Sequence, residues 1–376
     1  MEIPLTHNAI IYTNPGTASL KITQVPTPSP GPGQVLIRLT HSGVCHSDHA
    51  VMTNSWRWLP GLTSHDQVGG HEGVGEVVKL GPDLVDSGYS KYNGPGIKIG
   101  DRVGIKWFAS TCLHCLACMD SQEGSCFHPT ISGYSVPGTF QEYVLAPANY
   151  VTPIPDGVPS DAAAPILCGG LTVYSAFHKA RARAGEWVVI SGAGGGLGSL
   201  ACEIGSRGMG FRILGIDSAA KETLIRECGA EEFLPLDKFS RDPEGDKAMA
   251  NEVMRITEGG AAAVLVCTSA NAAYAQAVHF LRFCGTLVCV GITEGDEVPI
   301  RTVNPNMLIK LQLTVTASSV GNRKEAIEIL NLVARGVVKP RFTLHKPAEL
   351  GDIFARLEKG EILGRTVLSL DTESWK

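Results

Sequence analysis

The second half of the chain alternates between short apolar runs and longer amphipathic runs. Helical periodicity is found at 197–207, 219–228 and 272–283, and the apolar runs predict strands at 187–191, 211–216, 233–234, 262–267 and 286–291. Strands that alternate with helices of this length are typical of a parallel sheet with crossover helices. The pattern therefore predicts an α/β domain that begins a little before residue 187.

The first half of the chain has a different pattern of hydrophobic and polar residues. Residues 1–160 are rich in Gly, Pro, Val and Thr, and their short apolar runs predict an antiparallel, partly barrel-like β domain with long loops. One such loop is expected at 84–100, on the surface. Helices are predicted at 161–183 and 324–335, and a final helix and strand at 350–370.

Composition limits the classes of function. The chain has 376 residues, 44% hydrophobic and 18% charged, which indicates a globular protein of about two or three domains. A net charge of −5 gives no basic field for nucleic acid. The longest apolar run, 261–267, is far shorter than the ~20 residues of a membrane span. The first residues lack the features of a secretion signal, so we expect a cytoplasmic protein with no membrane partner.

Four of the 11 cysteines crowd into one short segment, with the spacing C-x2-C-x2-C-x7-C. They are Cys112, Cys115, Cys118 and Cys126. Short loops of this kind let thiolates converge on one tetrahedral ion, and four thiolates leave no open position, so a structural zinc is predicted. An iron–sulfur cluster is the alternative, but the distant fourth cysteine and the absence of a following proline argue against it.

A glycine turn follows the strand predicted at 187–191. Its spacing is Gly192-x-x-Gly195-x-x-Gly198, one residue longer in the first gap than the usual dinucleotide-binding form. Asp217 ends the next strand, about 20 residues on, where a carboxylate holds the ribose 2′-hydroxyl and repels a 2′-phosphate, so NAD is favoured over NADP. Lys221 could reach the 3′-hydroxyl, or it could be an ordinary solvated lysine.

Three further potential metal ligands lie in glycine-rich segments far apart in the sequence: Cys45, His71 and Cys168. A lone Cys or His is more often a core residue than a ligand. Two cysteines and one histidine, however, can form a catalytic zinc site whose fourth position is open to water or an alcohol oxygen. Their joint presence predicts such a site.

Together these motifs resemble the zinc-dependent medium-chain alcohol dehydrogenases, most closely the yeast-type enzymes. The resemblance extends over almost the whole chain, through the four-cysteine segment and residues 45–48, 70–75, 104–107, 192–200, 320–323 and 364–365. It implies a GroES-like β-rich catalytic domain at 1–169 with a structural-zinc lobe at 112–126, a Rossmann doubly wound parallel sheet at 170–317, and a return to the catalytic domain at 318–376. It also implies a homo-oligomer, with a tetramer favoured over a dimer.

The resemblance assigns roles to the matching residues around the metal. Cys45, His71 and Cys168 would bind the catalytic zinc, and Glu72 could approach or transiently bind it. Asp48 would hydrogen-bond His71 and fix its tautomer.

The resemblance also implies contacts to the substrate and the cofactor. Ser47 would hydrogen-bond the substrate oxygen and begin the proton relay. The implied cofactor contacts come from the glycine turn, from the residues around Asp217, and from residues expected beside the nicotinamide and the pyrophosphate. They are His46, Gly192, Gly195, Gly196, Leu197, Gly198, Asp217, Lys221, Val290, Ile292, Ser318 and Arg365.

The sequence departs from the family pattern near the substrate. The histidine that often ends the proton relay is replaced by Ala50, with His49 one position early, so His49 or water could take over. The approach to His71 is longer and carries polar residues at 64–67. Trp56, Trp58 and Trp107 lie in segments that border the substrate cleft in the family; each could simply be packing, although we expect Trp107 to face substrate.

We therefore predict an NAD-dependent enzyme with two zinc ions per chain that interconverts an alcohol with an aldehyde or ketone. The departures keep open a repurposed family member that acts on a specialised biosynthetic carbonyl or enone. A non-enzymatic nucleotide-binding protein is the third hypothesis, and intact metal ligands disfavour it.

Overall fold

The computed structural model describes residues 2–84, 96–294 and 298–375. The described chain divides into two compact units. Unit 1 comprises Met1–Cys168, Asn322–Ala334 and Phe342–Lys376, and unit 2 comprises Gly169–Gly321 and Arg335–Arg341. Most of the loop predicted at 84–100 lies outside the described residues.

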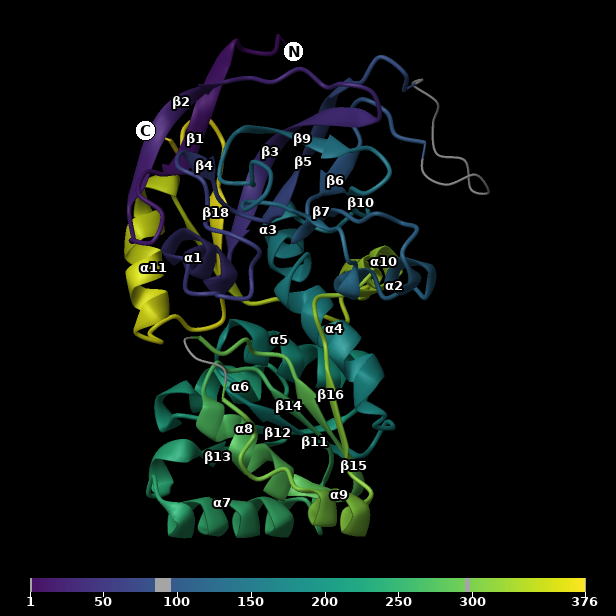
Figure 1. Ribbon diagram of the computed structural model, residues 1–376, viewed down its shortest axis with the longest axis vertical. Coiled ribbons are helices and arrows are strands. Elements are labelled where there is room, and N and C mark those ends of the chain that lie inside the picture. Colours follow the sequence, from purple (N-terminus) through teal and green to yellow (C-terminus); the bar gives the residue numbers. More distant parts are fainter. Residues whose placement is uncertain (1, 85–95, 295–297, 376) are drawn as a thin grey trace. The chain divides into compact units, whose positions relative to one another are not determined.

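Unit 2 is built on a parallel sheet whose strands follow the order β13-β12-β11-β14-β15-β16 (Figure 1). The described strands are β11 (Trp187–Ser191), β12 (Arg212–Asp217), β13 (Glu232–Pro235), β14 (Ala261–Val266), β15 (Leu281–Cys289) and β16 (Thr314–Ala317). Every residue of β11 and of β14 is buried. Continuous apolar strands of this kind are expected where helices cover both faces of a parallel sheet, and the predicted doubly wound α/β fold is confirmed.

The helices of unit 2 differ in detail from the prediction. They are α4 (Gly169–Ala180), α5 (Gly196–Glu203), α6 (Glu222–Glu227), α7 (Pro243–Ile256), α8 (Asn271–Ala277) and α9 (Pro305–Leu311). The helix predicted at 272–283 is wrong at its end, because β15 begins at Leu281. Likewise, the helix predicted at 161–183 is broken into α3 (Ser160–Ala163), a 3-10 turn and α4, with Cys168 at the break.

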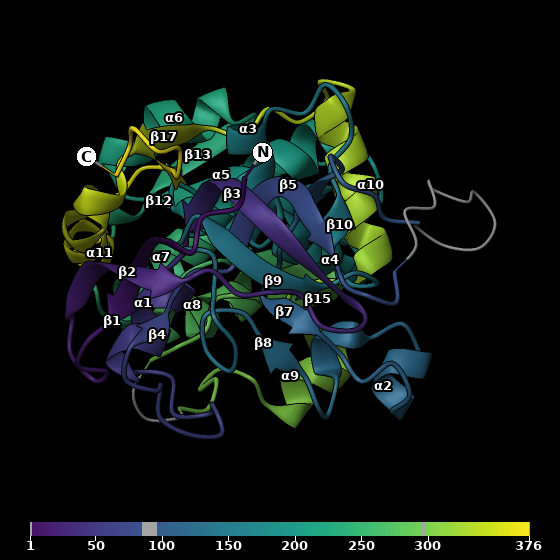
Figure 2. The same ribbon diagram turned by 90° about the horizontal axis from the view of Figure 1, so that it is seen from above.

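Unit 1 contains a mixed sheet with the order β10-β6-β5-β3-β18-β17, and β9 also pairs with β3. Its strands are β3 (Gln34–Val44), β5 (Glu72–Leu80), β6 (Arg102–Gly104), β9 (Tyr143–Pro147), β10 (Thr152–Pro153), β17 (Phe342–His345) and β18 (Arg365–Ser369). Figure 2 shows the long strands β3, β5 and β9 from above. The mostly antiparallel pairing of 1–160 agrees with the predicted β domain.

Smaller elements complete unit 1. Two lesser sheets pair β1 (Thr6–Tyr12) with β2 (Leu20–Pro26) and β4 (Gln67–Val68), and β7 (Phe108–Ser110) with β8 (Thr130–Ile131). Its α-helices are α1 (His46–Thr53), α2 (Leu116–Met119), the short α3 described above, α10 (Arg323–Ala334) and α11 (Leu350–Glu358). Among the described residues, none of the helices combines the length and the apolar character that crossing a bilayer requires.

Candidate active site and structural metal site

Three adjacent strands of unit 1 bring distant residues to one point. Strand β3 ends just before Cys45, β5 begins just after His71, and β18 begins at Arg365. In the sheet, Gly43 pairs with Glu72, and Val44 pairs with Thr366. The sheet register therefore places Cys45, His71 and Arg365 close together although they are far apart in the sequence.

The potential metal ligands predicted from the sequence do converge. Four buried side chains each offer one potential ligand atom, and these four atoms all lie within 4.8 Å of one another. The residues are Cys45, His71, Glu72 and Cys168. Zinc–sulfur bonds of ~2.3 Å place the corners of a tetrahedron roughly 3.8 Å apart, so the cluster is of the right size for one zinc ion. A hydrogen bond with Cys168 lowers the pKa of Cys45 well below its usual value, although burial opposes this, and a thiolate is the form that binds metal.

Asp48 fixes the orientation of His71. Its Oδ1 atom lies 2.7 Å from Nδ1 of His71, and its Oδ2 atom accepts a hydrogen bond of 2.9 Å from the backbone N–H of Cys45. With Nδ1 thus occupied, the free lone pair is on Nε2, which is buried and has no hydrogen-bond partner among the described residues. A buried nitrogen left in this state fits a metal ligand.

Arg365 forms a buried ion pair with Glu72, which the sequence analysis did not foresee. Their side chains are 5% and 0% exposed. Burial raises the pKa of Glu72 to about 7, while the guanidinium of Arg365 opposes that rise. Strand β3 makes room for the carboxylate with a glycine, since a Cβ atom on Gly43 would lie 1.9 Å from Oε2 of Glu72. The contact of Arg365 with a cofactor pyrophosphate stays a prediction.

Helix α1 carries the residues expected near the reacting groups. Ser47 Oγ lies 3.4 Å from Sγ of Cys45. The ring of His49 lies 5.8 Å from that of His46 and packs edge-on against Phe354 of α11, at 5.6 Å. The two histidines thus occupy neighbouring positions on one side of α1, while Ala50 is fully buried.

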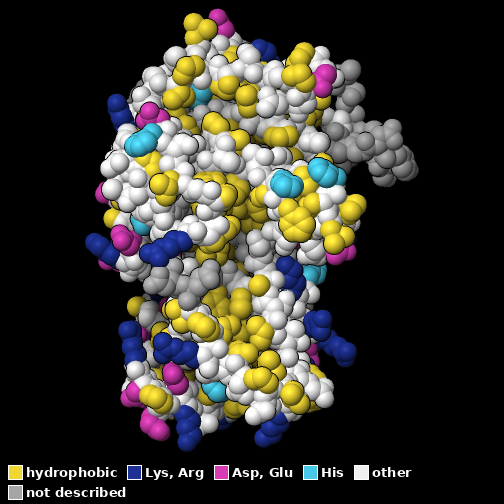
Figure 3. Space-filling model, viewed as in Figure 1, with side chains coloured by type: hydrophobic (Ala, Val, Ile, Leu, Met, Phe, Trp, Pro, Cys, Tyr) yellow, Lys and Arg dark blue, Asp and Glu magenta, His cyan; other side chains and the backbone are white. Residues whose placement is uncertain are grey.

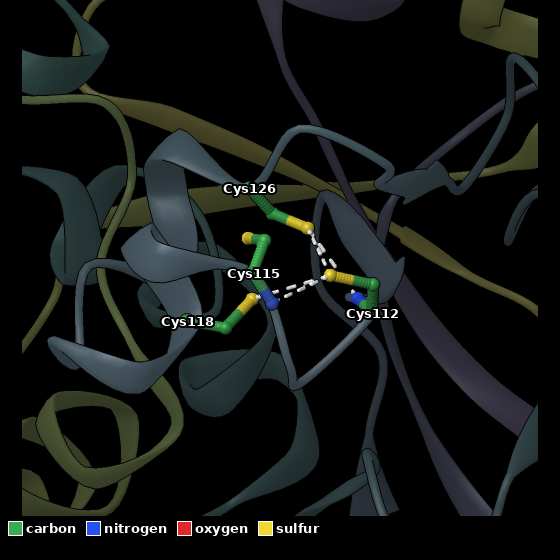
Figure 4. Close-up of side chains that lie close together, drawn as sticks. All are labelled: Cys112, Cys115, Cys118 and Cys126. Atoms are coloured by element: carbon green, nitrogen blue, oxygen red, sulfur yellow. Dashed lines mark hydrogen bonds between the residues drawn. The ribbon is translucent and has the colours of Figure 1, made fainter.

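The four-cysteine segment forms a lobe of unit 1 with little regular structure. The four Sγ atoms of this lobe all lie within 4.8 Å of one another; they belong to Cys112, Cys115, Cys118 and Cys126 (Figure 4). Backbone N–H groups donate to sulfur within the lobe, from Cys112 to Cys126 at 3.3 Å and from Cys115 to Cys112 at 3.4 Å. Hydrogen bonds from the backbone of Phe127 and of Cys118 lower the pKa of Cys115 to about 6.

These features suit a structural zinc ion. Helix α2 in this lobe has no buried residue, and Leu116, Met119 and Phe127 are exposed. Figure 3 shows hydrophobic side chains gathered where Figure 1 labels α2. With so little core, the lobe needs a cross-link, and four converging thiolates provide one.

The glycine turn of unit 2 lies beside the end of β12. Gly192 has a φ of +80°, which favours glycine, and a Cβ atom on Gly198 would lie 2.0 Å from the carbonyl oxygen of Gly192. Asp217 accepts a hydrogen bond of 2.8 Å from the N–H of Gly194 and pairs with Lys221 at 3.4 Å. The helix α5 begins at Gly196 and includes Leu197, so the turn leads directly into a helix N-terminus.

Residues expected beside the nicotinamide follow the carboxyl ends of two parallel strands. Val290 and Ile292 follow β15, and Ser318 follows β16, where its N–H donates to the carbonyl of Cys289 at 3.0 Å. Ser318 also accepts a hydrogen bond of 3.3 Å from Nζ of Lys179. Ligands bind at this edge of doubly wound sheets.

The chain combines two features. One unit has a parallel sheet of the kind that binds dinucleotides, and the other is rich in β-strands and contains a Cys-His-Cys cluster. This combination defines a zinc-binding dehydrogenase. Family models agree: residues 31–156 match the alcohol dehydrogenase GroES-like domain, and residues 196–335 match the zinc-binding dehydrogenase domain. The chain belongs to the zinc-binding alcohol dehydrogenase family.

Individual relatives agree with this assignment. Alcohol dehydrogenase 2 of Emericella nidulans is 52% identical over 98% of this chain and 99% of its own length. An alcohol dehydrogenase of Schizosaccharomyces pombe is 38% identical, over 96% and 97%. Among solved structures, the acetophenone reductase of Geotrichum candidum in complex with NAD has a TM-score of 0.80 at 27% identity and covers 99% of this chain and 100% of its own. The predicted family, enzymatic class and alcohol–carbonyl oxidoreduction are confirmed.

Proposed function

We propose that this chain is an NAD-dependent alcohol dehydrogenase whose catalytic zinc is bound by Cys45, His71 and Cys168. The convergence of these three residues, with His71 oriented by Asp48, carries the proposal. When bound, zinc acidifies the alcohol as a Lewis acid and NAD accepts its hydride. The remaining chemistry belongs to the chain, which must orient the alcohol, remove its proton and exclude water.

The residues around the cluster have the properties that these tasks require. Ser47 would accept the alcohol proton and pass it toward solvent, with His49 or water as the next acceptor. Asp48 keeps His71 in the tautomer that binds metal. Glu72, held by Arg365, is the fourth polar side chain of the cluster and would approach the metal during ligand exchange.

Preference for NAD follows from Asp217. Its carboxylate stands where the ribose 2′-hydroxyl is bound in dinucleotide sites, and a 2′-phosphate there would be repelled. Its ion pair with Lys221 holds that lysine beside the ribose site, where its ammonium group would reach the 3′-hydroxyl. The pyrophosphate would lie over the turn from Gly192 to Gly198, with His46 and Arg365 as its further contacts, and Val290, Ile292 and Ser318 would flank the nicotinamide.

We extend the proposal to organisation and location. The catalytic domain would comprise 1–169 and 318–376, and the cofactor domain 170–317. Family likeness supports a homo-oligomer, with a tetramer favoured over a dimer, in the cytoplasm.

Absorbance at 340 nm during incubation with an alcohol panel and NAD or NADP tests the activity, with zinc counted per chain. We expect NADH formation and about two zinc ions per chain. Cys45→Ser is expected to abolish hydride transfer while the far-UV circular dichroism is retained. Full activity after the catalytic metal has been stripped would refute the proposal.

A further inference from the structure

Tyr12, the last residue of β1, contacts both of the segments that hold His71 in place. Its side chain is fully buried. Its hydroxyl donates to the backbone carbonyl of Asp48 at 3.2 Å, and the carboxylate of Asp48 is hydrogen-bonded to the ring of His71 and to the backbone N–H of Cys45. The phenol therefore reaches the first turn of α1, which carries the residue that orients His71.

The same phenol packs against the chain that leads into His71. A Cβ atom on Gly69 would lie 1.9 Å from the hydroxyl oxygen of Tyr12 and 2.2 Å from its Cζ atom, so only glycine allows this approach. The backbones are paired as well, because Tyr12 lies opposite Gln67 where β1 pairs with β4. The approach to His71 is thus built directly on the ring of Tyr12.

A second segment, 139–140, holds this approach from its own side chains and backbone. Its two N–H groups donate to the carbonyl of Gly69 at 2.9 Å and to that of Gly70 at 3.0 Å. A Cβ atom on Gly70 would lie 2.7 Å from a hydroxyl oxygen of this segment, and the φ of +92° at Gly70 favours glycine. With this backbone fixed by 139–140 and by Tyr12, His71 has little freedom to move independently of the phenol.

Resting on the proposed function, we propose that Tyr12 is a positioning residue for the catalytic metal site. Its hydroxyl sets the spacing between the start of α1 and the approach to His71. At that spacing the carboxylate of Asp48 meets Nδ1 of His71, and Nε2 is left for the metal. Tyr12 is not a member of the four-residue cluster, so it acts through Asp48 and His71.

Removing only the hydroxyl is expected to weaken the metal site and to leave the fold intact. Tyr12→Phe keeps the ring that packs on Gly69 and deletes one buried hydrogen bond, whose net value limits the size of the effect. We expect the affinity for the catalytic zinc to fall about three- to tenfold. The affinity for the zinc of the four-cysteine lobe is expected to stay at the wild-type value.

Competition with a chelator, with zinc counted per chain, measures both affinities in the wild type and in Tyr12→Phe. NADH formation from an alcohol, followed during the same titration, identifies the catalytic ion. Tyr274→Phe is the matched control, because it also removes a buried phenol hydroxyl that donates to a backbone carbonyl, that of Gly291, but in unit 2. This control is expected to keep the wild-type affinity for both ions.

A double-mutant cycle separates positioning from a merely structural contribution. If Tyr12 acts through Asp48, then Tyr12→Phe lowers zinc affinity by less than about twofold when Asp48→Asn is already present, because the carboxylate that it positions has been removed. Circular dichroism and the unfolding temperature, recorded for the same four proteins, show whether each variant is folded.

Two results overturn the inference while the proposed function stands. One is a zinc affinity in Tyr12→Phe within about twofold of the wild type, even if the unfolding temperature falls, which would make the hydroxyl merely structural. The other is the same fold-loss with and without Asp48→Asn. If the wild-type protein binds zinc only at the four-cysteine lobe and forms no NADH, the proposed function is rejected, and this inference with it.

Discussion

Replacing Asp48 with asparagine tests how the chain prepares His71 for metal. The carboxylate faces two N–H donors, Nδ1 of His71 at 2.7 Å and the backbone N of Cys45 at 2.9 Å. Asparagine keeps one acceptor and turns the other into a donor. If its NH₂ faces His71, the imidazole must move its proton to Nε2 to accept that hydrogen bond, and Nε2 can then no longer bind zinc. If its NH₂ faces Cys45, two donors oppose each other.

The size of the effect follows from burial. Asp48 is 2% exposed, so water cannot repair the lost hydrogen bond. An unsatisfied buried donor costs about 1–3 kcal/mol, and 1.4 kcal/mol corresponds to about tenfold in an equilibrium constant. We therefore expect Asp48→Asn to lower zinc affinity or kcat/KM by about 10- to 100-fold, as is usual for residues that orient a metal ligand.

Two assays check this prediction. Zinc retention is measured by competition with a chelator, and kcat/KM by NADH formation. Asp352→Asn, an exposed change on α11, serves as the control and is expected to match the wild type. If Asp48→Asn stays within about twofold of the wild type in both assays, the orienting role of Asp48 is refuted.

Three further predictions concern other parts of the chain. Gly198→Ala is expected to abolish NADH binding or to unfold unit 2, because the added Cβ atom would lie 2.0 Å from the carbonyl oxygen of Gly192. NADH fluorescence and circular dichroism measure these two effects, and normal NADH binding by the variant would contradict the prediction. Cys115→Ser is expected to reduce zinc from about two ions per chain to about one and to lower the unfolding temperature, whereas retention of both ions would contradict the four-thiolate site. Burial lowers the pKa of Lys106 to about 7. Between this value and the ordinary lysine pKa, the folded chain therefore binds fewer protons than the unfolded chain. In this pH range the free energy of unfolding is expected to rise with pH, by up to about 1.4 kcal/mol per pH unit. Denaturant titrations compared with Lys106→Met check the sign, and a wild-type stability that does not rise relative to the variant would refute it.

The sequence predicted best what local spacing and burial decide. The strand at 187–191 agrees with the structure residue for residue, since all of it is buried between layers. The four-cysteine cluster followed from short spacings. The boundary between α8 and β15 was misjudged, because the apolar run around Phe280 suits a buried helix as well as a strand. Helix α7 was not predicted, although Asp242 accepts from the N–H of Gly245 as an ordinary N-cap.

Long-range contacts were the least accessible from the sequence. Glu72 and Arg365 become partners only through the pairing of β3 with both β5 and β18, and nothing local to either residue indicates that register. The orientation of His49 toward His46 and Phe354 likewise depends on how α11 packs on α1. Such contacts are properties of the assembled sheet and its helices.

A crystal structure of the zinc-loaded protein, with anomalous diffraction recorded at the zinc edge, measures the central claim most directly. We expect one peak about 2.3 Å from Sγ of both Cys45 and Cys168 and about 2.1 Å from Nε2 of His71. The absence of a peak there, or a Cys168 side chain turned away from the other two ligands, would contradict the account.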